Sequence, residues 1–103
     1  MATFGFEVET VGTFYSVGDE NSFFQWVYGL NGYKTCTGSG QSVQIDFELD
    51  DMDRGTLSEL VAVFRRYNIA DFSSLRALVN APDGAWFASP QMYWHELVFL
   101  DRT

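Results

Sequence analysis

The sequence predicts an α+β fold in which a single antiparallel sheet of about five to six strands carries two to three helices packed on one face. Three observations support this prediction. Some segments alternate strictly between apolar and polar residues, others repeat their apolar residues every three to four positions, and the turns between them are short. With 103 residues and 47% hydrophobic content, the chain is expected to form one domain over 1–103.

The first part of the chain contains two predicted strands and a predicted helix. Residues 3–9 alternate Phe and Val with Gly and Glu, which is typical of a strand with one buried face. Residues 13–17 are rich in β-forming types and are expected to return as its hairpin partner. A capping box that begins at Ser22 then favours a helix ending at Gly29 or Gly32. A buried strand is the alternative there, because the segment is also rich in β-forming residues.

The middle of the chain is predicted to form a hairpin and two further helices. Residues 33–37 and 43–49 read as two strands joined by a glycine-rich turn at 38–40, and the second strand has the clearest alternation in the sequence. A capping box and one continuous apolar face predict a helix over 56–67, with two arginines in its last turn. A shorter helix is expected over 71–79, with Leu75, Leu78 and Val79 facing inward.

The end of the chain is predicted to supply the closing strands of the sheet. Pro82, Asp83 and Gly84 form a strong turn signal, and strands are expected at 85–88 and 92–100 after it. The last of these segments is apolar on both faces. A central position in the sheet is therefore favoured, because an edge strand of that composition would promote aggregation.

Negative charge is concentrated in the first half of the chain. Residues 1–53 contain nine acidic residues and one basic residue, whereas residues 54–103 contain five of each, and the net charge is −8. The open face of the predicted sheet would display the acidic side chains of Glu7, Glu9, Asp46 and Glu48. Because carboxylates directly opposite each other repel, we expect either another strand or a cation between the two acidic strands.

An acidic surface of this kind defines the expected partner. It attracts a basic protein and repels nucleic acid and anionic membranes, because phosphates carry charge of the same sign. Tyr and Trp are common at protein interfaces and would act as anchors beside the acids, although packing in the core is the alternative for each of them. The candidate partner-binding residues are Glu7, Glu9, Asp46, Glu48, Asp50, Asp51, Trp86, Tyr93 and Trp94.

These observations predict a non-enzymatic protein-interaction module. An antidote-type inhibitor of a basic partner protein is one form of it, by analogy with the composition of small acidic inhibitors. The alternative function is a small-ligand binding protein or enzyme with an aromatic-lined pocket between the sheet and the helices. A homodimer formed through the open sheet or a strand edge is compatible with both hypotheses.

No motif predicts a catalytic residue, a metal site or a cofactor. An EF-hand loop starting at Asp51 would place Ala62 where a bidentate Glu is needed, and His95 is the only histidine, so a two-histidine zinc motif is absent. Cys36 and His95 lack any local signature of a nucleophile and its base. The turn at 38–40 precedes a strand, whereas a phosphate-binding loop opens a helix.

The sequence also indicates a location. Cys36 is the only cysteine, so no disulfide within the chain is possible. The first residues lack the basic and apolar segments of a signal peptide, and no apolar run is long enough to cross a bilayer. A reducing, cytoplasmic location is therefore expected.

Overall fold

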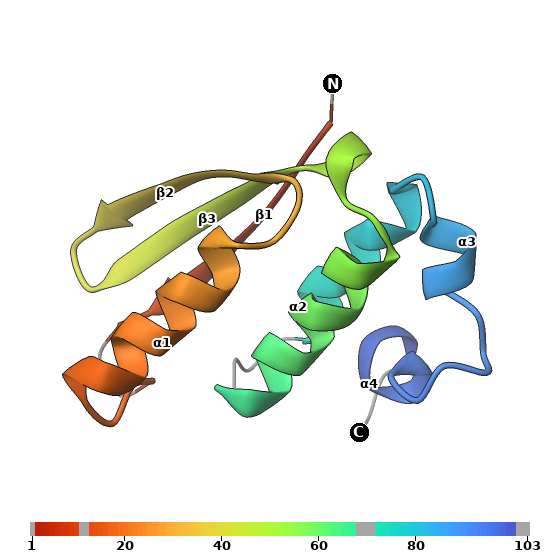
Figure 1. Ribbon diagram of the computed structural model, residues 1–103. Helices are drawn as coiled ribbons and strands as arrows, with labels where there is room; N and C mark the ends of the chain where they lie inside the picture. Colours follow the sequence, from red (N-terminus) through yellow and green to blue (C-terminus); the bar gives the residue numbers. More distant parts are fainter. Residues whose placement is uncertain (1, 11–12, 68–71, 101–103) are drawn as a thin grey trace.

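A three-stranded antiparallel sheet with helices on one face forms the fold (Figure 1). The computed structural model describes residues 2–10, 13–67 and 72–100. The strands are β1 (Thr3–Glu9), β2 (Tyr33–Ser39) and β3 (Ser42–Glu48). Their order across the sheet is β1-β3-β2, so β3 is the central strand and pairs with both neighbours.

The helical layer contains α-helices and 3₁₀ helices of very different lengths. The long helices are α1 (Val17–Tyr28) and α2 (Arg54–Arg66), and the others are η1 (Leu49–Asp51), η2 (Phe72–Asn80), α3 (Gly84–Phe87) and α4 (His95–Phe99). Figure 1 shows α1 and α2 lying under the same face of the sheet, with α3 and α4 on the far side of α2. The predicted α+β class with a single antiparallel sheet is confirmed, but the described residues form more helices than the two to three predicted.

The strand predicted at 3–9 is confirmed, and those predicted at 33–37 and 43–49 form with shifted ends, since β2 extends to Ser39 and Leu49 belongs to η1. Their alternation has the expected cause. Every second side chain of β1 is buried, and in the central strand Ile45 and Phe47 are fully buried. These residues face the helices, while the intervening polar residues face away from them. A two-residue turn with Gly40 at a positive φ of 62° joins β2 to β3.

The helix expected from Ser22 is present, but it starts earlier than predicted. Ser16 is its N-cap, and the Ser16 hydroxyl accepts a hydrogen bond of 3.1 Å from the backbone N–H of Asp19. The strand predicted at 13–17 is therefore wrong. Its β-forming residues lead into a cap, and capping satisfies the free amide groups of the first helical turn. The helix ends at Gly29, one of the two predicted positions.

The helix predicted over 56–67 is confirmed, with its start moved by two residues. Asp53 is the N-cap, because its Oδ1 atom accepts a hydrogen bond of 2.9 Å from the Thr56 N–H. The predicted apolar face is fully buried and consists of Leu57, Leu60, Val61 and Phe64. Across the interior, the Phe64 ring lies 5.0 Å from the ring of Phe6 in β1, which joins α2 to the sheet.

The strands predicted at 85–88 and 92–100 are wrong, because both segments contain short helices, α3 and α4. The sheet consequently has three strands instead of five to six. Their length explains the misleading pattern, because helices of four and five residues are too short to show a helical period in the sequence. The Trp94 indole fixes the arrangement by donating a hydrogen bond of 2.8 Å to the Phe87 carbonyl.

The helix expected over 71–79 forms as the 3₁₀ helix η2, and residue 71 lies outside the described residues. Leu75 and Leu78 are buried as predicted. Val79 is not, because 42% of it is exposed. A 3₁₀ helix has three residues per turn, so it aligns positions 75 and 78 and turns position 79 away from them.

Candidate interaction surface

The open face of the sheet brings together the four carboxylates that the sequence placed there. Glu7 and Glu9 are exposed on β1, and Asp46 and Glu48 are half-buried on β3. The other outward residues of the two strands are Thr3, Gly5, Ser42 and Gln44. No aromatic or large aliphatic side chain lies among them, so this surface is polar along its whole length.

The register of β1 against β3 places one carboxylate on each successive outward-facing pair. Glu9 lies opposite Ser42 and Glu7 lies opposite Gln44. Further along, Asp46 lies opposite Gly5, and Glu48 lies opposite Thr3. We call these four pairs the carboxylate ladder. Its acids occupy β1 at one end of the sheet and β3 at the other, so no two of them are direct cross-strand partners.

The strand order corrects the expectation that another strand separates the acidic strands. β1 and β3 are direct neighbours. Repulsion is reduced because a neutral residue faces each acid, and because outward pairs two residues apart are about 6.8 Å from one another. Thus the sheet tolerates four carboxylates on one face without an intervening strand.

Asp46 is the most tightly held acid of the ladder. Its Oδ1 accepts a hydrogen bond of 3.0 Å from the Gln44 side-chain amide, and its Oδ2 lies 3.4 Å from the Thr35 hydroxyl of β2. Glu48 differs, because its Oε2 atom is buried and has no hydrogen-bond partner among the described residues. Asp46 is therefore fixed in position by two neighbouring side chains, whereas one oxygen of Glu48 is buried without such a contact.

Among the described residues, one cation reaches the open face. Lys34 sits in an irregularity of β2, between the residues that pair with Phe47 and Asp46. Its Nζ lies 3.4 Å from the Thr3 hydroxyl, next to the pair that contains Glu48. Four acids and one base leave this face with a formal charge of −3.

No described arginine lies on the strands that carry the ladder. Arg54 Nε lies 3.2 Å from Asp83 Oδ1, and both residues belong to the helical layer. The other described arginines are Arg65 and Arg66 in the last turn of α2 and Arg76 in η2. The described arginines thus all lie in the helical layer, which also carries the acids Asp19, Glu20, Glu59, Asp83 and Glu96.

Asp50 and Asp51 extend the acidic region beyond the end of β3. Both are exposed in η1, which connects the sheet to α2. Asp53 follows them as the helix cap, and its second oxygen accepts a hydrogen bond of 2.7 Å from the Asn31 side chain. The Thr56 amide and this Asn31 contact hold the pKa of Asp53 below its usual value.

The three aromatic candidates lie in the helical layer, away from the carboxylate ladder. Trp86 in α3 is half-buried, with the Arg54 guanidinium 5.0 Å from its ring centre. Tyr93 precedes α4 and is 61% exposed. Trp94 is only 3% exposed and packs on Phe87, so it offers almost no surface to a partner. The structure does not bring these aromatics beside the acids.

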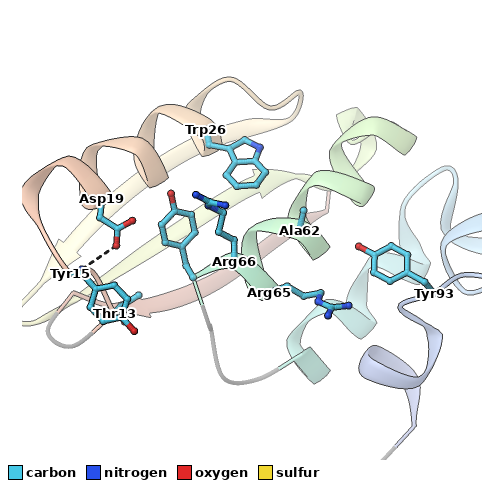
Figure 2. A pocket seen from close by; sticks show the side chains of 9 residues that line it. Thr13, Tyr15, Asp19, Trp26, Ala62, Arg65, Arg66 and Tyr93 are labelled. Atoms are coloured by element: carbon cyan, nitrogen blue, oxygen red, sulfur yellow. Dashed lines mark hydrogen bonds between the residues drawn. The ribbon is translucent and has the colours of Figure 1, made fainter.

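A groove that the sequence did not predict crosses the other side of the molecule (Figure 2). It has a volume of about 710 Å³ and combines arginines with aromatic rings. Its lining residues are Thr13, Tyr15, Asp19, Trp26, Ala62, Arg65, Arg66, Tyr67 and Tyr93. The arginines of this set were recognised in the sequence only as partners of the helix dipole, because their neighbours come from distant segments.

The interior between the sheet and the helices is filled by side chains of the core. Phe6 and Phe47 stack across two strands at 6.5 Å, and Phe47 also meets the Tyr33 ring at 6.0 Å. The groove lies outside this layer, along α1 and α2. It is therefore in a different place from the pocket expected between sheet and helices.

The described residues contain neither a metal-binding cluster nor a membrane-spanning helix. Across residues 2–10, 13–67 and 72–100, no three His, Cys, Asp or Glu side chains are grouped so that they would hold a metal ion. In the same part of the chain, no helix combines the length and apolar character needed to cross a bilayer.

Comparison with known proteins gives no relative for this chain. No family model matches it, and neither does any curated protein or solved structure.

Proposed function

We propose that this protein is a non-enzymatic interaction module that binds a basic protein through the open face of its sheet. The observation that carries the proposal is the carboxylate ladder, in which four consecutive outward pairs each contribute one acid. A patch of one charge sign on a rigid sheet raises the local concentration of an oppositely charged partner and speeds its association.

The positions of the cations support this role. Among the described residues, Lys34 is the cation near the ladder, whereas the arginines lie in α2 and η2. A basic partner approaching from the helical side meets like charge from Arg65 and Arg66. The same partner approaching the open face is attracted, so the charge distribution orients the encounter.

The spacing of the ladder suggests what part of a partner fits it. Successive outward pairs are about 6.8 Å apart, which is also the distance between alternate residues of an extended chain. A partner segment with Lys or Arg at every second position would therefore match one cation to each acid. Carboxylates paired with arginine add directional hydrogen bonds to this attraction.

The composition of the face also predicts how the complex behaves. Aromatic and aliphatic anchors supply most of the affinity of typical interfaces, and the outward residues of β1 and β3 include none. Binding through this face should consequently depend strongly on charge and weaken as salt increases. An antidote-type inhibitor that masks a basic surface in the cytoplasm is the form of the function that we favour.

Self-association through the same face is disfavoured by its charge. A symmetric dimer would place the ladder of one copy against the ladder of another, and like charges would repel. Any homodimer should therefore use another surface, such as the free edge of β2. A mass measurement in solution at two salt concentrations tests this expectation.

Affinity capture from the native host tests the proposal. The tagged protein is incubated with host extract at about 50 mM salt, and the retained proteins are identified before and after a wash at about 500 mM. We expect a basic protein that is retained at low salt and released at high salt. The test variant combines Glu7→Gln with Glu9→Gln, which removes two exposed ladder charges and should lower retention several-fold.

A matched control removes the same charge from the helical side. It combines Glu20→Gln in α1 with Glu59→Gln in α2, and the new amide oxygen at residue 59 can still accept the hydrogen bond from Trp26. The control should retain the partner like the natural protein. An equal loss of partner retention in both double variants would contradict the proposal. Retention of a partner that is not basic would contradict it as well.

A further inference from the structure

The groove between α1 and α2 is a separate site, independent of the carboxylate ladder. Its walls come from the segment before α1, from α1 itself and from the last turns of α2, and Tyr93 forms one rim. A hydrogen bond of 2.8 Å from Trp26 Nε1 to Glu59 Oε1 links the two helices beside it. The volume of about 710 Å³ is within the range of small-molecule sites, which are typically 300–1,000 Å³.

The charge of the groove is opposite to that of the chain. Its lining contains two guanidinium groups, from Arg65 and Arg66, and one carboxylate, from Asp19, in a protein with a net charge of −8. This carboxylate already has a hydrogen-bond partner within the protein, because Asp19 Oδ2 accepts a hydrogen bond of 3.1 Å from the Tyr15 backbone N–H. The groove therefore offers a surplus of positive charge to a ligand.

The two arginines point in different directions and serve different parts of the groove. Figure 2 shows the Arg66 side chain directed toward Trp26, and that of Arg65 directed toward Tyr93. The Arg65 guanidinium lies 5.8 Å from the centre of the Tyr93 ring. A guanidinium supported by an aromatic ring keeps its N–H groups available at its edges, where they can donate to an anion.

Aromatic rings form the apolar part of the same groove. Tyr67 is largely buried, and its ring lies 6.4 Å from that of Trp26 in an edge-to-face arrangement. The indole N–H of Trp26 is already used by Glu59, so this side chain presents mainly ring surface to the groove. Tyr15 and Tyr93 are exposed at opposite ends of the groove, where each ring can contact a ligand from one side (Figure 2).

From these features we infer that the groove binds a small aromatic anion, a planar ring that carries a carboxylate, sulfonate or phosphate group. The rings of Trp26 and Tyr67 contact the aromatic part of the ligand, and Arg66 or Arg65 donates hydrogen bonds to its anionic group. A cation is repelled by the two guanidinium groups. A purely apolar ligand leaves both of them without a partner.

Binding of 2-naphthoate tests this inference, because the probe combines a flat ring with one negative charge. The matched neutral probe is 2-naphthalenemethanol, and the matched anion without a ring is acetate. Titrations are followed by NMR of the labelled protein, which reports affinity and location together. We expect saturable binding of 2-naphthoate with shifts at groove residues, and binding of both other probes at least about tenfold weaker.

Two single variants identify the residues responsible. Arg66→Gln or Arg65→Gln should each weaken 2-naphthoate binding, with a loss of about tenfold for the arginine that contacts the anion. Both residues are exposed, so the variants should keep the fold, and their NMR spectra verify it. Arg54→Gln is the control, because Arg54 pairs with Asp83 outside the groove and its loss should leave the affinity unchanged.

Several results would overturn the inference. They are an absence of saturable 2-naphthoate binding, equal affinity for the neutral probe, or shifts that map away from the groove. Unchanged affinity in both groove arginine variants would have the same meaning. The Glu7→Gln and Glu9→Gln double variant should bind 2-naphthoate normally, so failure of this site and failure of the docking proposal can be told apart.

Discussion

Gly5 of β1 lies opposite Asp46 of β3, and the Asp46 carboxylate occupies the space that a Cβ atom at residue 5 would need. The Gln44 amide nitrogen lies 2.5 Å from the same position, so both side chains lean over the glycine. Absence of a side chain at residue 5 thus lets Gln44 and Asp46 make their hydrogen bond across the surface of β1.

Replacing this glycine tests whether it positions the Asp46 carboxylate. Gly5→Ala should displace the ends of the Gln44 and Asp46 side chains, which are flexible, while the fold remains intact. We expect an altered Gln44 side-chain amide signal by NMR and about threefold weaker binding of a lysine-rich peptide. Gly38→Ala is the control, because nothing lies within 4 Å of a Cβ at that position. An unchanged Gln44 signal in Gly5→Ala would contradict the role given to this glycine.

Gly84 should be one of the most sensitive positions of the helical layer. A Cβ there would collide with the backbone of Val79, which has no freedom to move aside as a side chain would. We expect Gly84→Ala to lower the free energy of unfolding by about 1–3 kcal/mol, measured by urea denaturation. Gly18→Ala in α1 meets only the Ser16 hydroxyl at 3.8 Å and should be neutral or stabilising. Equal stability of the two variants would contradict the packing of α3 on η2.

Asp53 should make stability depend on pH. Hydrogen bonds from the Thr56 amide and Asn31 lower the pKa of this carboxyl in the folded protein. Its stabilising contribution is therefore complete above the usual Asp pKa of about 4 and is lost as the pH falls through the lower folded value. Asp53→Ala should cost about 1 kcal/mol at neutral pH, because the N-cap of α2 is lost.

The matched variant for this effect is Asp53→Asn, which keeps a capping oxygen but does not titrate. Unfolding by urea is compared at pH 7 and pH 3. The advantage of the natural protein over Asp53→Asn should be larger at pH 7. A constant difference between the two proteins would show that the carboxylate of Asp53 is not specifically stabilised by folding.

Trp94 provides a test of the helical C-terminal segment. Its indole donates to the Phe87 carbonyl at 2.8 Å, and its ring stacks on that of Phe87 at 5.4 Å. Trp94→Phe keeps an aromatic ring but leaves this buried carbonyl without its donor. We expect a loss of about 1–3 kcal/mol in the free energy of unfolding. A loss below the error of the measurement would argue against this buried contact.

The sequence correctly predicted the elements in which apolar residues repeat with one clear period, either every second residue in a strand or every three to four residues in a helix. The central strand alternates polar and apolar residues through Ile45 and Phe47, and α2 repeats its buried residues through Leu57, Leu60 and Phe64. Both elements have one buried and one solvated face, and that asymmetry produces the pattern from which they were recognised.

The segments that the sequence misassigned lack such an asymmetry. At 13–17 the β-forming residues favoured a strand, but the cap formed by Ser16 and Asp19 starts a helix there. The helices at 84–87 and 95–99 have only four and five residues, which is too short to establish a helical period. Their partners in the helical layer decide their conformation, and those contacts come from tertiary structure.

For the candidate site, the sequence predicted the shared face of the acids but not their register. Alternation alone places Glu7 and Asp46 on outward positions. The pairing of Glu7 with Gln44, and of Asp46 with Gly5, depends on how β1 is aligned against β3. The groove was not predicted because it also depends on tertiary structure. Tyr15, Arg66 and Tyr93 are far apart in the sequence and line one groove only in the folded protein.

Mapping of a basic peptide by NMR tests the central claim most directly. The probe is a peptide of about nine residues that alternates Lys and Ser, long enough to follow the ladder when extended. The account predicts salt-sensitive shifts at the outward residues of β1 and β3, and weaker binding of a peptide with its lysines in one block. It also predicts that the Glu7→Gln and Glu9→Gln double variant reduces these shifts. Shifts confined to the helices, or unchanged in that variant, would contradict the assignment of the open face as the docking surface.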